Sequence, residues 1–242
     1  MMNTNLLTLE GVQTHIGAYH ILHGVDLAVP KGQLTMLLGR NGAGKTTTLR
    51  TIMGLWHASQ GRVRFGDKDI TALQTPQIAG LGIAYVPENM GIFSDLTVKE
   101  NMLLAARGAK NAAQIDDVRL KWIFKLFPAV EKFWNHPAGK LSGGQKQMLA
   151  VSRAIVEPRE LLLIDEPSKG LAPVMINNMI DAFAELKRSG VTILLVEQNI
   201  NFAQRLGDNV AVMDNGRVVH SGSMAAFSAD AQLQQSLLGL AL

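Results

Sequence analysis

The chain has 242 residues, of which 47% are hydrophobic and 18% are charged. This balance is typical of a folded globular protein with one large or two small domains, and it argues against disorder. There is no cysteine, which excludes disulfides, iron–sulfur clusters and thiol catalysis. The 23 basic and 20 acidic residues nearly balance, so the net charge of +3 does not indicate nucleic-acid binding, and we expect no nucleic-acid partner.

No apolar run approaches the roughly 18 to 20 residues that span a bilayer, so we expect no membrane-spanning segment. The opening MMNTNLLTLEG lacks the basic stretch and apolar core of a secretory signal. The six histidines are scattered. Because side chains alternate along a strand, His20 and His23 are predicted to point to opposite faces, which argues against a shared metal site.

The first part of the chain alternates short predicted strands with turns. These strands cover residues 6–12, 24–29 and 33–39, and then 62–70, which folds about a Gly-Asp turn. A helix is predicted to follow GAGKTT and to end near Gly54. The segment GIAYVPE, residues 82–88, is predicted to be a buried strand with a polar end.

Between about residues 90 and 157 the pattern becomes helical. Predicted helices cover residues 97–107, 118–134 and 143–157. The first begins with a capping box made by Thr97 and Glu100. The second is expected to stop or kink at Pro128, and the third starts after Ser142.

Two further apolar strands follow, at 160–166 and 191–197, with a predicted helix over 173–190 between them. The chain closes over 208–242 with a hairpin and a short helix. The Asn215-Gly216 pair of this hairpin suits a type I′ turn.

Fully apolar strands that alternate with helices predict an α/β protein with a doubly wound, mostly parallel sheet. In such sheets ligands bind beyond the carboxyl ends of the strands. We therefore expect the ends of LTMLLG, IAYVPE, LLLIDE and ILLVEQ to meet in one cleft.

The strongest motif is GRNGAGKT, which fits the phosphate-loop pattern G-x-x-x-x-G-K-[ST] between a strand and a helix. Its glycines allow backbone N–H groups to surround phosphates, and the helix N-terminus adds a positive dipole. Lys45 is predicted to reach the β- and γ-phosphates of ATP, and the Thr46 hydroxyl to bind Mg²⁺. The predicted nucleotide-binding residues here are Gly39, Arg40, Asn41, Gly42, Ala43, Gly44, Lys45, Thr46 and Thr47.

The segment LLLIDE supplies the complementary carboxylates. Asp165 ends an apolar strand where a Mg²⁺ ligand is needed, and Glu166 follows as a candidate base for the attacking water. An Asp-Glu pair alone is an ordinary strand exit, and it gains this meaning from the phosphate loop.

The pentapeptide LSGGQ, Leu141 to Gln145, lies 20 residues before Asp165. Ser142 and Gln145 form a capping-box pattern, and two glycines expose the backbone for an anion. Together with the phosphate loop, this motif resembles the ATP-binding cassette (ABC) ATPases over nearly the whole chain. The resemblance implies a P-loop NTPase core, an N-terminal antiparallel β subdomain and an inserted helical subdomain at 90–157, in a single domain spanning 1–242.

In that family two nucleotide-binding domains pair head to tail around ATP. The resemblance therefore implies that Ser142, Gly143, Gly144 and Gln145 contact the nucleotide bound to a second ABC ATPase subunit. It also implies that Gln198 stands where many members carry a switch histidine that senses the γ-phosphate, while Glu197 is a flanking residue.

The family's glutamine after YVP is Glu88 in this chain, which offers oxygens toward Mg²⁺ or the attacking water. The predicted catalytic residues are thus Glu166, Gln198 and Lys45, and the predicted metal ligands are Thr46, Asp165 and Glu88.

A narrower resemblance is carried by IAYVPENMGIFSDLTVKENM, DEPSKGLAP and LLVEQN. These segments are similar to one of the two ATPases of branched-chain amino-acid importers. The ATPases of urea and amide importers are close relatives of this group and are the next most similar. The resemblance implies two membrane permease subunits, a periplasmic binding protein acting indirectly, and a peripheral location on the cytoplasmic face of the inner membrane. The helical subdomain is then expected to receive a permease helix near Phe93.

Several positions depart from the family pattern. The adenine-stacking aromatic is expected near Ile16, so Tyr19 or His15 are the candidates to replace it. Lys169 stands where the narrower group usually has leucine, and Ala172 where the broad family often has aspartate.

Two other functions stay open at this point. One is a soluble ABC factor that acts on ribosomes or DNA, although the chain lacks the tandem cassettes or long coiled coils of such proteins. The other is a regulatory nucleotide-binding subunit with low turnover, which Ile16, Glu88 and Gln198 suggest.

Overall fold

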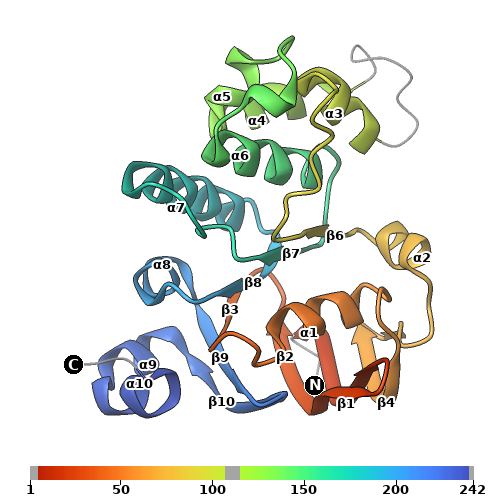
Figure 1. Cartoon of the computed structure of the whole chain (residues 1–242), viewed down its shortest axis with the longest axis vertical. Helices are drawn as coiled ribbons and strands as arrows, with labels where there is room; N and C mark the ends of the chain where they lie inside the picture. Colours follow the sequence, from red (N-terminus) through yellow and green to blue (C-terminus); the bar gives the residue numbers. More distant parts are fainter. Residues whose placement is uncertain (1–4, 107–114, 240–242) are drawn as a thin grey trace.

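The computed structural model describes residues 5–106 and 115–239, whose strands form two sheets (Figure 1). The four-stranded sheet has the order β2-β1-β4-β5, and the six-stranded sheet the order β10-β9-β3-β8-β7-β6. The first contains β1 (Asn5–Ile16), β2 (Tyr19–Pro30), β4 (Ala58–Phe65) and β5 (Lys68–Asp69). The second contains β3 (Leu34–Gly39), β6 (Ile83–Val86), β7 (Leu161–Asp165), β8 (Thr192–Glu197), β9 (Asn209–Asp214) and β10 (Arg217–Ser223).

Five strands of the larger sheet run parallel, and only the hairpin strand β10 is antiparallel to its neighbour. The register pairs Leu38 with Glu197, and Asp165 with Val196. The carboxyl ends of β3, β7 and β8 therefore meet at one edge, as predicted. The four-stranded sheet is antiparallel throughout, which confirms the predicted N-terminal β subdomain.

The central parallel strands β3, β7 and β8 are buried on both faces, which explains their continuous apolar sequences. Alternate residues of β3 face two different clusters of apolar side chains: Met36 and Leu38 belong to the cluster on the helical side, and Leu37 to the cluster beneath the antiparallel sheet. β8 divides in the same way, with Leu195 and Leu194 on opposite sides. The sheet is thus a rigid layer between two cores, and its strand ends are fixed in space.

Most helices lie on the two sides of the sheet, and α3 to α6 form a lobe at one end of the molecule (Figure 1). None of the helices within 5–106 and 115–239 is long and apolar enough to cross a membrane. The helices are α1 (Lys45–Ile52), α2 (Thr75–Gly80), α3 (Val98–Ala105), α4 (Asp117–Leu126), α5 (Pro128–Lys132), α6 (Gly143–Ala154), α7 (Pro173–Arg188), α8 (Ile200–Leu206), α9 (Met224–Ala229) and α10 (Ala231–Leu238), with a 3₁₀ turn over Ala138–Lys140.

The predicted starts of α3 and α6 are confirmed, whereas α1 begins at Lys45, inside the GAGKTT segment that it was expected to follow. Thr97 caps α3 and Ser142 caps α6, and both capping boxes are complete. Pro128 separates α4 from α5, because proline cannot donate the helical hydrogen bond. The helix predicted over 97–107 corresponds to α3, which ends at Ala105, and residue 107 lies outside the described residues.

The single C-terminal helix predicted after the hairpin is wrong, because α9 and α10 are two helices joined at Asp230. The end of the predicted C-terminal region, 240–242, lies outside the described residues. The short helices α2 and α8 were not predicted either. With six and seven residues, they offer too little sequence for a helical period to show.

The prediction that His20 and His23 point to opposite faces is also wrong. Their ring centroids lie 4.1 Å apart, and the His20 ring also stacks on His15 at 4.1 Å. The pairing with β1 shifts between Leu22 and His20, so Ile21 is an extra residue in β2. Without the extra residue, His20 and His23 would point to opposite faces of the strand. The bulge shifts the alternation by one residue, so both side chains lie on the same face.

Candidate active site

The loop from Gly39 to Thr46 connects the end of β3 to α1. Gly39 and Gly44 have φ angles of 150° and 105°, which L-residues with a side chain rarely adopt. A Cβ at Gly39 would collide with the carbonyl oxygen of Met213. The close approach of β9 therefore requires glycine and holds the loop in its curved form.

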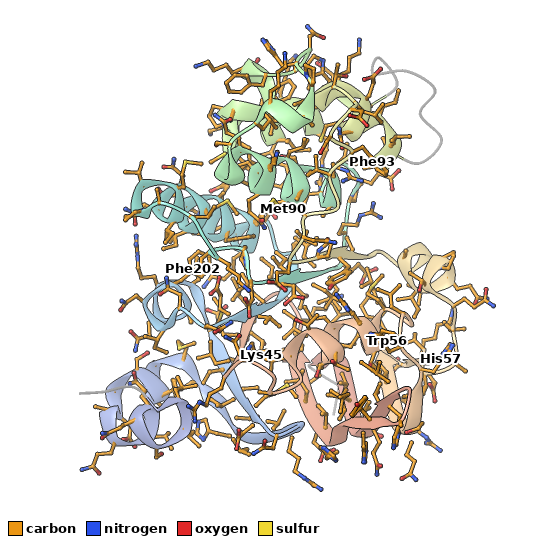
Figure 2. All side chains as sticks on the ribbon, viewed as in Figure 1. Lys45, Trp56, His57, Met90, Phe93 and Phe202 are labelled. Carbon is orange, nitrogen blue, oxygen red and sulfur yellow. The ribbon has the colours of Figure 1, made fainter. Side chains whose placement is uncertain are left out.

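Lys45 is the first residue of α1 and is only 5% exposed (Figure 2). Its ammonium donates to the carbonyl oxygens of Gly39 at 2.8 Å and Arg40 at 3.1 Å. It also lies 3.8 Å from Oε1 of Glu166. Burial lowers the pKa of Lys45, and the nearby charges of Glu166 and Asp165 oppose this shift. The lysine thus places a positive charge within the curve of the loop.

Asp165 is fully buried at the end of β7 and is held from two sides. The Thr46 hydroxyl donates to its Oδ1 at 3.1 Å, and the Tyr85 hydroxyl donates to its Oδ2 at 3.3 Å. Burial raises the pKa of Asp165, and the Thr46 hydrogen bond opposes this shift. Burial also raises the pKa of Tyr85 to about 12, so Tyr85 remains a donor.

Tyr85 was missed by the sequence reasoning. A signal was available, since a tyrosine within a buried strand needs a partner for its hydroxyl. The partner could not be known before the pairing of β6 with β7 was known.

The predicted donors suit Mg²⁺ in chemistry, because a hydroxyl and a carboxylate oxygen already lie together at Thr46 and Asp165. The described residues contain no cluster of three or more histidines and carboxylates able to hold a metal by themselves. Magnesium commonly takes one or two carboxylates and completes its shell with phosphates and water, so this limited donor set fits.

Glu166 follows Asp165 with a φ angle of 47°, a left-handed conformation that costs a non-glycine residue about 1–3 kcal/mol. The side-chain amide of Gln198 donates to its Oε1 at 2.5 Å. The ammonium of Lys169 lies 3.4 Å from its Oε2. The structure therefore brings Glu166 and Gln198, two predicted catalytic residues, into direct contact.

Glu197 was predicted to be a flanking residue, but it is 2% exposed and has several partners. Its Oε1 accepts the backbone N–H of Ser168 at 2.9 Å, and its Oε2 accepts those of Gln198 at 3.1 Å and Asn199 at 3.2 Å. Burial raises the pKa of Glu197, and these hydrogen bonds oppose the shift. Glu197 thus ties the loop after Glu166 to the end of β8. The available signal was a carboxylate ending a buried strand, which needs donors.

Glu88 lies beyond the end of β6 and pairs with Lys169, whose ammonium is 2.5 Å from its Oε1. Hydrogen bonds and charge from Glu88 and Glu166 raise the pKa of Lys169. The sequence flagged both positions as departures from the family pattern, but nothing in it linked one to the other.

A cavity of about 370 Å³ opens in front of these groups. Its lining joins the phosphate loop, the strand-end acids and one residue of β2: Ile21, Asn41, Gly42, Gly44, Lys45, Thr46, Thr47, Glu88, Glu166 and Lys169. A second hollow of about 400 Å³ adjoins Gly39, Arg40, Asn41 and Gln198. Ala43, in contrast, is buried in the core below the loop.

Ser142 to Gln145 begin α6 in the helical lobe and contribute nothing to either hollow. Ser142 and Gly143 are exposed, while Gly144 packs closely against Met175. The structure therefore does not bring this predicted nucleotide-binding segment to the phosphate loop of its own chain.

The candidates for adenine stacking also do not gather at the cavity. The Tyr19 side chain is 75% exposed at the start of β2, and the His15 ring is stacked on His20. Ile16 ends β1 and is partly buried.

A loop that curves around a buried lysine, with a threonine bonded to a strand-end aspartate, is the arrangement found in P-loop nucleoside triphosphatases. The parallel sheet and the position of the loop at its carboxyl edge agree with this class.

Comparison with known proteins narrows the class. The family model described as ABC transporter matches residues 22–169. The chain is 39% identical over 234 residues to the high-affinity branched-chain amino acid transport ATP-binding protein BraG of Pseudomonas aeruginosa, an alignment that covers 97% of this chain and 100% of that protein. It is 37% identical to a probable branched-chain amino acid transport ATP-binding protein, LivF, of Archaeoglobus fulgidus, covering 84% of this chain and 86% of the other.

Among solved structures, an ATP-binding cassette of an ABC transporter in its ADP conformation matches with a TM-score of 0.82 and 26% identity, over 98% of this chain and 99% of that one. The chain therefore belongs to the ABC transporter family, as one of its nucleotide-binding ATPase domains.

Proposed function

We propose that this chain is the ATP-hydrolysing subunit of an ABC importer for branched-chain amino acids or a related small polar solute. The observation that carries the proposal is the contact between Glu166 and Gln198 beside the phosphate-loop lysine. The solute is inferred from the names of the relatives, BraG and LivF, which cover most of the chain.

In this proposal Lys45 and the backbone N–H groups of residues 39–47 hold the phosphates of ATP. The start of α1 is suited to this role, because its N-cap Gly44 has no side-chain capping bond and the first N–H groups remain available to an anion.

We assign Thr46, Asp165 and Glu88 to Mg²⁺, which when bound would neutralise phosphate charge. Thr46 and Asp165 orient each other through their hydrogen bond, and Tyr85 fixes the second oxygen of Asp165. Glu88 is more exposed and pairs with Lys169, so we place it at the outer side of this group.

We assign Glu166 as the base that accepts a proton from the attacking water. Gln198 holds one oxygen of Glu166 and is also the sensor for the γ-phosphate. Unlike a histidine, its amide does not titrate near neutral pH, so it serves only as a hydrogen-bonding group.

The segment from Ser142 to Gln145, which is exposed at Ser142 and Gly143, is assigned to the nucleotide of a second ABC ATPase subunit, either an identical chain or a sister chain. The helical subdomain, 90–157, is assigned to the contact with two membrane permeases, with Phe93 in the contact region. Phe93 is 49% exposed and lies at the edge of the helical lobe (Figure 2). The proposal includes a location at the cytoplasmic face of the inner membrane and a periplasmic binding protein that acts through the permeases.

The test is Glu166→Gln in the purified chain assembled with its partners. Loss of the base should lower steady-state ATP hydrolysis by about a hundredfold or more, while ATP binding persists and the ATP-bound dimer accumulates. Glu10→Gln, an exposed acid on β1 outside the helical subdomain, is the matched control. Undiminished hydrolysis by Glu166→Gln would contradict the assignment.

A further inference from the structure

Lys169 lies between two carboxylates at the mouth of the cavity. Its ammonium is 2.5 Å from Oε1 of Glu88 and 3.4 Å from Oε2 of Glu166. The Lys169 and Glu88 side chains are 58% and 43% exposed, whereas the Glu166 side chain is only 9% exposed. One cation therefore bridges an outer acid and an inner acid.

The fold fixes this bridge from both ends. Glu88 follows β6 and Lys169 follows β7, and these strands are parallel neighbours, so residues 81 positions apart meet at one edge. The Lys169 backbone N–H also donates to the carbonyl oxygen of Glu166 at 3.2 Å. This turn presents the lysine stem toward both acids.

Four acids crowd the strand ends here: Glu88, Asp165, Glu166 and Glu197, and the last already accepts three backbone N–H groups. The charges of Glu166 and Glu88 both disfavour ionisation of Asp165. ATP adds further negative charge at the same place, so the balance of charge should control its affinity. Lys45 neutralises part of this charge from inside the loop, and Lys169 is the second lysine in the cavity lining.

We propose that Lys169 is a positioning residue of the nucleotide site, which compensates the negative charge of Glu88 and thereby preserves affinity for the phosphates of ATP. This inference rests on the proposed ATP site around Lys45. Glu88 and Lys169 are then a coupled pair, in which the positive charge of the lysine offsets the negative charge of the acid.

If the charges of Lys169 and Glu88 are coupled, the ATP affinities of the single and double variants should show it. Removing the lysine alone leaves an uncompensated acid that repels phosphate, whereas removing both charges restores the original balance. A lysine that only stabilises its loop would show no such restoration.

The experiment measures ATP affinity by calorimetric titration of the isolated full chain in EDTA, so that Mg²⁺ ligation by Glu88 does not contribute, for wild type, Lys169→Met, Glu88→Gln and the double variant. We expect Lys169→Met to weaken binding about fivefold, in the upper range of a partly exposed ion pair. The double variant should bind within about twofold of wild type, and added salt should shrink the difference. Lys121→Met is the matched control, because it removes an exposed lysine 2.6 Å from Asp117 in the helical lobe.

The inference is overturned if Lys169→Met binds ATP like Lys121→Met, or if the double variant binds as weakly as Lys169→Met. Should Lys169→Met fail to fold, Lys169→Arg, which keeps the charge, is compared with Lys169→Gln, which removes it; equal affinities would overturn the inference.

Lys45→Ala distinguishes a failure of the proposed ATP site from a failure of the role proposed for Lys169. If it binds ATP normally, the proposed site itself fails; if it loses binding while Lys169→Met does not, only the role of Lys169 fails.

Discussion

The starts of α1 and α6 are both rich in glycine, yet they are built differently. Gly44, the N-cap of α1, is left-handed and makes no side-chain cap. Ser142, the N-cap of α6, accepts the N–H of Gln145 at 3.3 Å, and the Gln145 side chain accepts the N–H of Ser142 at 2.9 Å. The first helix start keeps its N–H groups available to a ligand, and the second has already used some of them.

The surroundings of the two helix starts also differ, because one lines a cavity and the other is exposed on the surface. The start of α1 lines a cavity together with a buried lysine and strand-end carboxylates. The start of α6 lies on the surface of the helical lobe, and Gly143 has no other group within contact distance of a Cβ placed on it. The start of α1 therefore agrees with the phosphate-binding role that we propose for it, and the exposed Ser142 and Gly143 agree with the proposed contact to the nucleotide of another subunit.

The largest effect should come from Lys45→Ala. This change removes a buried ammonium aimed into the phosphate loop, and we expect ATP affinity of the isolated chain to fall by about a hundredfold, the upper range for a charged hydrogen-bonding group. Calorimetric titration measures the loss, with Lys121→Ala as the control. An affinity unchanged from that of the control would show that α1 does not hold the phosphates.

The difference between these two regions also explains what could be predicted from the sequence. The phosphate loop and Ser142 are local motifs whose geometry is set within a few residues, and the structure has both in the expected strand–loop–helix and capped-helix settings. Asp165 needed only the position of a buried strand end.

Contacts between distant segments could not be predicted in this way. Tyr85 and Asp165 are 80 residues apart, and Glu88 and Lys169 are 81 apart, so both contacts depend on the pairing of β6 with β7. The role of Glu197 in joining two loops could not be predicted, because one of its donors, the N–H of Ser168, comes from the loop after β7. The histidine cluster depends on a bulge at Ile21 that no alternation pattern shows.

We expect a smaller effect, on the free energy of unfolding, when the glycine at each helix start is replaced by alanine. Gly44→Ala forces a side chain into φ 105° and against Leu22, so we expect a loss of about 1–3 kcal/mol in the free energy of unfolding. Gly143→Ala meets open space at the first position of α6, and should be neutral or stabilising by up to about 1 kcal/mol. Urea unfolding of both variants provides the comparison, and equal destabilisation would show that the two starts are built alike.

The most direct test of the central claim is ATP titration of Ser142→Ala, performed on the isolated chain at a concentration where light scattering finds it monomeric. If α6 serves the nucleotide of another subunit, Ser142→Ala should bind ATP within about twofold of wild type, while hydrolysis in the assembled transporter falls at least about tenfold. A loss of ATP affinity in the monomer as large as that of Lys45→Ala would contradict the account, because both helix starts would then hold one nucleotide within one chain.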